Sequence, residues 1–398
     1  MPAGLAASLG VDELEKLKQF ALNDAQREKI EAVIEHGSNR KAAKALGVAP
    51  SSVDNTLQSI RRRAARLGYS PDHDMTRPVP DGFSVSGVST MYDAEGNVRA
   101  QWVKSKQERD MLLKATMEAA IDIFSEHDMK VPKIAEPKAN NKDLLSVYPM
   151  GDPHIGMYAW ARETGEDFDL KIAERNLTLA VEKLVADSPA SEQALIVNVG
   201  DFFHSDTQDN RTSRSGHALD VDGRWAKVLD VGIRAMRQCI EACLRKHKNV
   251  HVINEIGNHD DHTAVVLTIA LAMAYENNPR VTFDRNPGRF HYYRFHDVLI
   301  GVTHGDTVKP EKLAGIMATD RPQDWGETTR RYWYTGHIHT RTAHDLAGCT
   351  AESFRTLAAK DAWTASMGYR SGRDMYCIVH HKNYGEIARN RKDILMLE

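Results

Sequence analysis

Long apolar runs are absent from this sequence. No stretch reaches the roughly 18 to 20 continuous apolar residues that a membrane-spanning helix needs, and residues 1–19 lack the basic start and apolar run of a signal peptide. We therefore expect a cytoplasmic protein without a membrane partner. Paired cysteines are lacking as well: the four cysteines show no CxxC spacing typical of zinc sites. We expect all four to be reduced core residues.

A strong net charge is also lacking, since the formal net charge is -3 over 398 residues. A composition of 41% hydrophobic and 27% charged residues is that of a globular chain with material for two or three domains. Residues 39–66 depart from this average, because they hold seven basic residues and the single acid Asp54. A segregated basic surface of this kind favours an anionic partner.

The same region predicts three short helices. Residues 24–35 carry apolar side chains on one face, Gly37 and Ser38 supply a stop and an N-cap, and a second helix over 39–46 ends at Gly47. A third helix begins at Pro50 and runs into the arginines. The pattern resembles a helix-turn-helix, with Ala43, Gly47 and Val53 at that family's offsets.

In that family the third helix enters the major groove of DNA. The resemblance implies DNA contacts by ten residues of this region: Arg40, Lys41, Lys44, Ser51, Ser52, Asn55, Gln58, Arg61, Arg62 and Arg63. The alternative is a plain three-helix bundle that docks on the rest of the chain, with the arginines as a solvated face.

A change of composition predicts four parts: a helix-turn-helix domain over 1–70, a connector over 71–127, a linker over 128–143 and a catalytic domain over 144–398. The connector begins with a stretch rich in proline and aspartate. It then predicts a β-hairpin from strands at 83–92 and 98–104 joined by a turn at 93–97, followed by a helix over 107–126. The hairpin is either a DNA-binding wing or the cover of a sheet edge.

Five polar motifs each follow a predicted strand in the last domain. The strands cover 144–148, 194–199, 250–253, 298–303 and 332–334, with helices at 172–184 and 226–247 between them. The motifs are Asp152-x-His154, Gly200-Asp201, Gly257-Asn258-His259, His304 and Gly336-His337-x-His339. Strand ends on the same side of a layered α/β architecture converge, so we expect these side chains to meet at one site.

The residue types indicate the ligand of that site. Two carboxylates, one amide oxygen and several imidazoles, with no thiolate, suit Mn²⁺, Fe, Zn²⁺ or Ni²⁺ better than Ca²⁺ or an iron–sulfur cluster. Seven donor groups exceed the needs of one such ion. Two divalent ions sharing a carboxylate would use them all, an arrangement common in phosphoester hydrolysis.

The five motifs together resemble the signature of the calcineurin-like metallophosphoesterases over residues 144–398. That resemblance implies a four-layer α/β/β/α sandwich preceded by the small helical domain and the β-hairpin. It assigns Asp152, His154 and His339 to one metal and Asn258, His304 and His337 to the other, with Asp201 as the bridge. It further implies that His259 donates a proton to the leaving oxygen. Mn²⁺ is the metal that we expect.

A histidine three residues after Asp201 resembles the DNA double-strand-break-repair nucleases of this superfamily. If that likeness holds, His204 assists substrate placement; otherwise it hydrogen-bonds a metal ligand from outside the coordination sphere. Arg211, Arg214 and Arg331 are candidates to clamp phosphate oxygens. Only 59 residues follow His339, so the segments that bind an ATPase partner in the repair nucleases are not expected.

The function expected from these patterns is a DNA nuclease of the bacterial and phage repair-exonuclease type, acting in the cytoplasm of a bacterium or phage-infected host. Two alternatives stay open. One is a phosphatase or cyclic-nucleotide phosphodiesterase whose first domain serves for docking. The other is a DNA-binding regulator with little or no catalytic activity.

Overall fold

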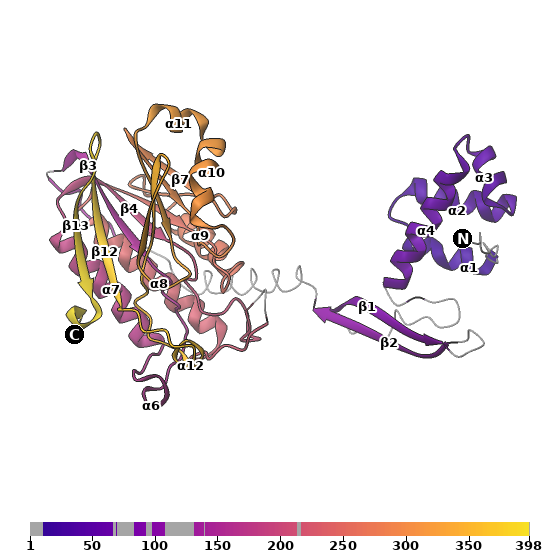
Figure 1. Ribbon diagram of the computed structural model, residues 1–398, viewed down its shortest axis with the longest axis horizontal. Helices are drawn as coiled ribbons and strands as arrows, with labels where there is room; N and C mark the ends of the chain where they lie inside the picture. Colours follow the sequence, from indigo (N-terminus) through magenta and orange to yellow (C-terminus); the bar gives the residue numbers. More distant parts are fainter. Residues whose placement is uncertain are drawn as a thin grey trace. The chain divides into compact units, whose positions relative to one another are not determined.

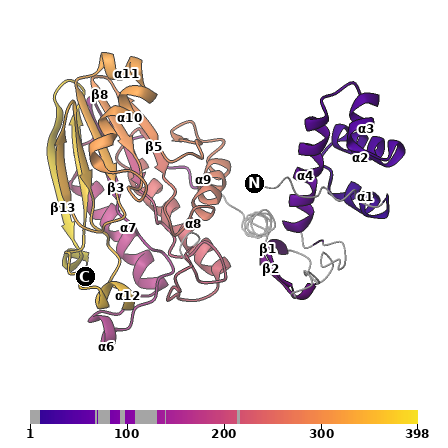
Figure 2. The ribbon, with the colours of Figure 1, turned by 45° about the vertical axis from the view of Figure 1, so that its right-hand side comes forward.

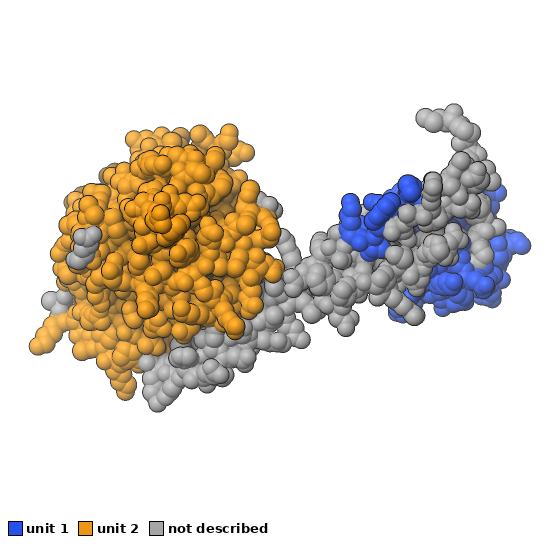
Figure 3. All heavy atoms as spheres, turned by 90° about the horizontal axis from the view of Figure 1, so that it is seen from below, with its two compact units in different colours: residues 1–114 blue, residues 115–398 orange. Residues whose placement is uncertain are grey.

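A computed structural model describes residues 11–66, 69, 83–92, 98–107, 131–138, 140–212 and 216–397. The chain divides into two compact units, residues 1–114 and 115–398, coloured separately in Figure 3. The expected turn at 93–97 and nearly all of the expected helix at 107–126 lie outside the described residues.

The first unit begins with the helices α1 (Val11–Leu17), η1 (Lys18–Phe20), α2 (Asp24–His36), α3 (Asn39–Ala45) and α4 (Pro50–Arg66). Of these, α2, α3 and α4 lie at the three predicted positions, whereas α1 and η1 were not predicted. The Asn23 side chain caps α2 by accepting the Gln26 amide at 3.0 Å. Gly37 and Gly47 have φ of 71° and 67°, which lets the chain turn sharply after α2 and α3. Apolar side chains of all four α-helices share one core.

The predicted hairpin is also present in the first unit. Strands β1 (Phe83–Tyr92) and β2 (Val98–Gln107) pair antiparallel and form a two-stranded sheet of their own. Among the strands that the structure describes, neither pairs with a larger sheet.

The second unit contains two sheets (Figure 1). The six-stranded sheet has the order β13-β12-β3-β4-β5-β6. Strands β3 to β6 run parallel to one another, and β12 pairs antiparallel with both of its neighbours, β3 and β13. Its strands are β3 (Asn141–Met150), β4 (Ser191–Asn198), β5 (Asn249–Asn254), β6 (Val281–Phe283), β12 (Asp374–His381) and β13 (Gly385–Asp393). The second halves of β3 and β4 are largely apolar and buried, as expected of strands covered on both faces.

The five-stranded sheet has the order β10-β11-β9-β8-β7. Its strands are β7 (His291–Phe295), β8 (Val298–Val302), β9 (Arg330–Thr335), β10 (Thr342–Leu346) and β11 (Cys349–Ser353). β8, β9 and β11 are parallel neighbours, so the ends of β8 and β9 lie at the same edge.

Helices cover the outer face of each sheet, and this confirms the predicted α/β/β/α sandwich. The six-stranded sheet packs against α7 (Leu170–Asp187), α8 (Trp225–Leu244) and α9 (Thr263–Ala274). The five-stranded sheet packs against α10 (Leu313–Asp320), with α11 (Pro322–Glu327) beside it. A third apolar cluster, which includes Val197 and Ile300, fills the space between the sheets. The described part of this unit also contains four short helices: α6 (Ala161–Thr164), η2 (Pro310–Lys312), α12 (Ala362–Ser366) and η3 (Ile394–Leu397).

The expected linker is partly held on this unit. The Arg280 guanidinium donates to the carbonyl oxygen of Ile134 at 2.7 Å, and the Asn140 amide donates to that of Lys246 at 3.1 Å. All four cysteines are buried and free, as expected. No helix in the described part of the chain is long and apolar enough to cross a membrane.

Candidate metal centre

The five motifs converge at the carboxyl ends of strands from both sheets. In five strands no more than two residues separate the end of the strand from a motif: β3, β4 and β5 of one sheet and β8 and β9 of the other. Three groups of side chains result, two with a carboxylate and one of the histidines His154, His204 and His259, and within each the possible ligand atoms all lie within 4.8 Å of one another. The first group is Asp152, His154 and His339, and the second is Asp201, His304 and His337. The structure thus brings together residues far apart in sequence, as predicted.

The first group is compact and mostly buried. Nε2 of His339 lies 3.1 Å from Nε2 of His154 and 3.6 Å from Oδ1 of Asp152. The backbone amide of His337 donates to both carboxylate oxygens of Asp152, at 2.9 and 3.1 Å. Asp152 is fully buried. A buried carboxylate facing two imidazoles is a donor set that suits a divalent ion.

The Asn258 side chain lies beside the second group. Nε2 of His304 lies 3.2 Å from Oδ2 of Asp201 and 3.1 Å from Oδ1 of Asn258. Nδ1 of His304 donates to the carbonyl oxygen of Val199 at 2.8 Å. That hydrogen bond fixes the ring orientation and leaves Nε2 directed at the other two side chains, as in metal-binding histidines.

Unusual backbone angles place these ligands. The φ angles are 41° at Asp152, 46° at His154, 51° at Asp201, 68° at His337 and 51° at His339. Residues other than glycine seldom adopt this left-handed region, and such strain concentrates at functional sites. The strain supports a ligand-binding role for these five positions.

The glycine that precedes a motif leaves room for a ligand of another motif. A Cβ on Gly257 would lie 1.9 Å from Oδ1 of Asp201, and one on Gly336 would lie 2.5 Å from Oδ2 of Asp152. A Cβ on Gly200 would lie 2.4 Å from Nδ1 of His304. All three distances are too short for any side chain, so glycine is required there.

The electrostatics of the site differ from one imidazole to the next: the pKa of His154 and of His204 is lowered, whereas the pKa of His304 and of His339 is raised. Burial and the neighbouring imidazoles lower the pKa of His154 and of His204. Burial raises the pKa of Asp201, but His304 and His259 outweigh it and hold that pKa well below its usual range. Burial lowers the pKa of His304, yet Asp201 and Asp152 raise it to about 10. Because a ligating imidazole is neutral, binding of a metal ion by His304 would be coupled to release of a proton.

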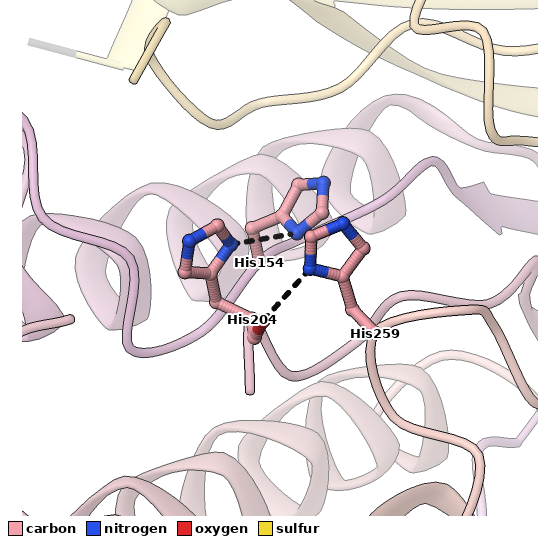
Figure 4. A group of neighbouring side chains, drawn as sticks. All are labelled: His154, His204 and His259. Atoms are coloured by element: carbon pink, nitrogen blue, oxygen red, sulfur yellow. Dashed lines mark hydrogen bonds between the residues drawn. The ribbon is translucent and has the colours of Figure 1, made fainter. Parts of the chain in front are cut away.

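Figure 4 shows His154, which belongs to the first group, together with His204 and His259. Nδ1 of His204 lies 3.3 Å from Nδ1 of His154, and Nδ1 of His259 donates to the carbonyl oxygen of His204 at 2.8 Å. His259 therefore carries its proton on Nδ1, and its Nε2 is left for another partner. The His204 side chain is buried and touches the ligand His154, so this position agrees with support of a ligand.

Sequence reasoning missed the residues that hold the motif loops in place. The Asp260 carboxylate accepts the amides of Phe203 at 3.0 Å and Gly257 at 2.9 Å, which ties two motifs together. The Thr356 hydroxyl donates to the carbonyl oxygen of Asp152 at 2.6 Å. Asp260 stands directly after His259, and this adjacency was the only available signal.

The three arginine candidates have different positions. Arg331 lies near the start of β9, whereas the histidines follow its end. Its guanidinium donates to the carbonyl oxygens of Trp325, Thr328 and Gly348 and stacks on the Trp325 ring, so it supports the fold there rather than facing the ligands. Arg211 is exposed and donates to the carbonyl oxygen of Gly216 at 2.8 Å. Arg214 lies outside the described residues.

The candidates for DNA contact lie on α3 and α4 of the first unit. Two of them are engaged within it: Ser52 accepts a hydrogen bond from Lys29, and Arg63 donates to the carbonyl oxygen of Phe20. The other eight are exposed: Arg40, Lys41, Lys44, Ser51, Asn55, Gln58, Arg61 and Arg62. Part of the α4 surface, including Asn55, Gln58 and Arg62, lines a shallow depression.

Comparisons with known proteins give weak likenesses. No family model matches the sequence, and no curated protein is similar to it. A conserved Streptococcus pneumoniae protein described as a predicted phosphoesterase aligns over 63% of this chain and 98% of its own, with 8% identity and a TM-score of 0.26. Vps29 of Entamoeba histolytica, solved with zinc, aligns over 63% of this chain and 99% of its own, with 11% identity and a TM-score of 0.26.

A third solved structure shows a similarly weak likeness to this chain. The 5'-nucleotidase of Candida albicans aligns over 66% of this chain and 54% of its own, with 10% identity and a TM-score of 0.29. TM-scores this low carry no argument about function. The assignment of the fold therefore rests on the strand order, the layers and the ligand groups described above.

Proposed function

We propose that this chain is a two-metal phosphodiester hydrolase that cleaves DNA. The observation that carries the proposal is the pair of ligand groups around Asp152 and Asp201, built from nitrogen and oxygen donors at strained backbone positions. Asp152, His154 and His339 would hold one ion, and Asn258, His304 and His337 the other, with Asp201 between them. Mn²⁺ is the ion that we propose.

Two such ions, when bound, activate a water molecule and neutralise charge on a phosphoryl group. The chain's own residues supply the rest. His259 carries its Nδ1 proton toward the His204 carbonyl oxygen, so a protonated Nε2 can give its proton to the leaving oxygen. General-acid assistance of this kind contributes typically about 10²- to 10⁴-fold. His204 packs against His154 and orients it.

The choice of DNA as substrate rests on the first unit. Helices α3 and α4 resemble a helix-turn-helix, and exposed Asn55, Gln58 and Arg62 lie along α4. In this proposal the polar side chains read base edges and the basic ones bind phosphates. A phosphatase or cyclic-nucleotide phosphodiesterase would need no such surface.

The test is Mn²⁺-dependent cleavage of end-labelled single- and double-stranded DNA by the full chain. Asp201→Asn keeps the shape of the side chain but removes its charge, and we expect it to abolish cleavage. Gly315→Ala, at an exposed position of α10 with no atom near the added Cβ, is the control and should cut normally. Intact DNA beside hydrolysis of a small phosphate ester would overturn the nuclease proposal.

A further inference from the structure

Exposed aromatic side chains gather on two neighbouring segments of the second unit. Tyr158 and Trp160, which lead into α6, are 45% and 48% exposed. Trp363 of α12 and the following Met367 and Tyr369 are 55%, 61% and 40% exposed. We call these five residues the aromatic ledge. A group of large apolar side chains left in water marks a binding surface more often than a structural one.

The two parts of the ledge lie side by side. α6 and α12 contact each other and are neighbours in both ribbon views (Figures 1 and 2). The Trp363 and Tyr369 rings have centroids 6.0 Å apart and planes tilted by 35°. The seven residues from 366 to 372 are all exposed, so the surface around these rings is open.

The ledge adjoins the ligand loops. Tyr158 stands four residues after His154 in sequence. Thr340, which directly follows His339, shares a 2.7 Å hydrogen bond between hydroxyl groups with Ser371, two residues after Tyr369. Both halves of the ledge are thus tied to loops that carry ligands of the first group. A chain-like substrate with a phosphate at those ligands would extend over the ledge.

Most acids around the ledge are occupied by contacts within the protein. Asp361 accepts the amide of Thr364 at 2.8 Å as the N-cap of α12. Asp167 accepts the amide of Ala161 at 2.7 Å. Glu166 is paired with Arg373. These carboxylates are partly neutralised or satisfied, which reduces their repulsion of an approaching anion.

Two arginines beside the ledge are exposed to solvent. Arg162 is exposed and its guanidinium lies 5.3 Å from the Trp160 ring centre. Arg370 is exposed beside Tyr369 and donates only to backbone carbonyl oxygens of the described residues, those of Ala365 and Tyr369. Aromatic rings interleaved with arginines are the surface by which proteins hold single-stranded nucleic acid, since bases stack on the rings and phosphates meet the cations.

We propose that the aromatic ledge stacks the bases of a single-stranded DNA end while a phosphate of the same strand lies at the two ligand groups. This inference rests on the proposed function and specifies its substrate. Stacking on Trp363 and Trp160 holds the strand without reading its sequence, because every base has a π-face. Duplex DNA, whose bases are already stacked, cannot use the ledge.

The test measures binding separately from cleavage. Fluorescence anisotropy of a labelled thymidine dodecamer is recorded with full-length Asp201→Asn protein and Mn²⁺, with and without Trp363→Ala. We expect the alanine variant to bind about 10-fold more weakly, in keeping with the loss of one stacked base. Trp363→Phe should restore most of the affinity, which separates lost stacking from misfolding.

A matched control and an abasic ligand sharpen the test. Tyr384 is 66% exposed in the turn that follows β12, whereas the ledge precedes β12, so Tyr384→Ala should bind normally. An abasic oligomer of equal length should bind Trp363→Ala and its parent equally. Equal affinity of the thymidine oligomer for both would overturn the ledge proposal, as would a dimer of the parent protein that Trp363→Ala breaks.

The two proposals fail in different ways. Normal cleavage of single-stranded DNA by Trp363→Ala, at unchanged affinity, refutes the ledge and leaves the nuclease proposal standing. Absence of cleavage on any DNA, together with oligomer binding that depends on Trp363, refutes the nuclease proposal and keeps the ledge as a binding surface.

Discussion

Single glycines decide whether the ligand loops can close around the proposed metals. Three glycines each precede a proposed ligand in sequence and lie close to a proposed ligand from another loop: Gly200, Gly257 and Gly336. At Gly257 the limiting atom is Oδ1 of Asp201, which also accepts the amide of His259 at 2.8 Å. The Gly257 backbone and the Asp201 carboxylate therefore lie too close together for a methyl group to fit between them.

This geometry predicts a specific loss in Gly257→Ala. The added Cβ would displace Asp201, so we expect metal affinity to fall about 10- to 100-fold, the range seen when groups supporting a metal site are altered. Isothermal titration with Mn²⁺ measures the loss. Gly315→Ala adds the same methyl group at an open position and should bind Mn²⁺ normally. Equal affinities of the two variants would contradict the close approach at Gly257.

At the scale of elements, a buried histidine connects the two sheets. His291 begins β7 of the five-stranded sheet, and its imidazole lies 2.8 Å from Glu255, just after β5, and 3.0 Å from Asp284, just after β6. Burial lowers the pKa of His291, but the two carboxylates outweigh it and raise that pKa to about 9. The charged imidazole thus holds strand ends of both sheets together.

A raised histidine pKa predicts that stability falls with increasing pH. The contribution is fully present below the unfolded pKa of about 6.5 and is lost as pH rises through the folded value of about 9. Its size is on the order of 3 kcal/mol, because one pKa unit corresponds to about 1.4 kcal/mol. Urea unfolding in the presence of a chelator, from pH 6 to pH 10, measures the slope.

Asp284→Asn is the matched control for this slope. It removes one of the two carboxylates that raise the His291 pKa and should flatten the decline without creating a cavity. An unchanged slope in this variant would show that His291 does not carry the pH dependence.

The elements of the second unit were predictable where their apolar runs were long. The strands that end before the five motifs and the helices α7 and α8 lie at the predicted places. The ligand residues were predictable because each follows a strand. The assignment of strands to sheets was not, since β3 and β8 have the same kind of apolar run but belong to different sheets.

Other elements gave too little local signal. Strand β6 has only three residues. Strand β10 has no fully buried residue, as is common for an edge strand. The engagement of Arg331 with carbonyl oxygens and of Ser52 with Lys29 depends on residues distant in sequence. Contacts of that kind decide whether a polar side chain is available to a ligand, and the sequence pattern does not contain them.

At the scale of the whole molecule, the proposed DNA recognition and the proposed hydrolysis fall to different units. Exposed Arg61 and Arg62 near the end of α4 belong to the first unit, and every proposed metal ligand belongs to the second. Each unit has its own apolar core. Changes on the surface of one should therefore leave the core of the other intact.

This separation predicts the behaviour of Arg61→Ala combined with Arg62→Ala. Duplex affinity should fall, and the slope of log affinity against log salt should decrease by about two, one for each lost phosphate contact. Hydrolysis of a small phosphodiester should be unchanged. The control is Arg245→Ala, an exposed arginine of the second unit. Unaltered duplex binding by the double variant would exclude the α4 surface.

The proposed ligands come from both sheets of the sandwich, so the complete set of ligands forms only when the two sheets have packed together. A nascent or damaged chain with only one sheet in place holds at most part of the donor set. Hydrolytic activity, if it requires both ions, then begins only when the last layer has docked. In this proposal a chain in which only one of the two sheets has formed would not hydrolyse DNA.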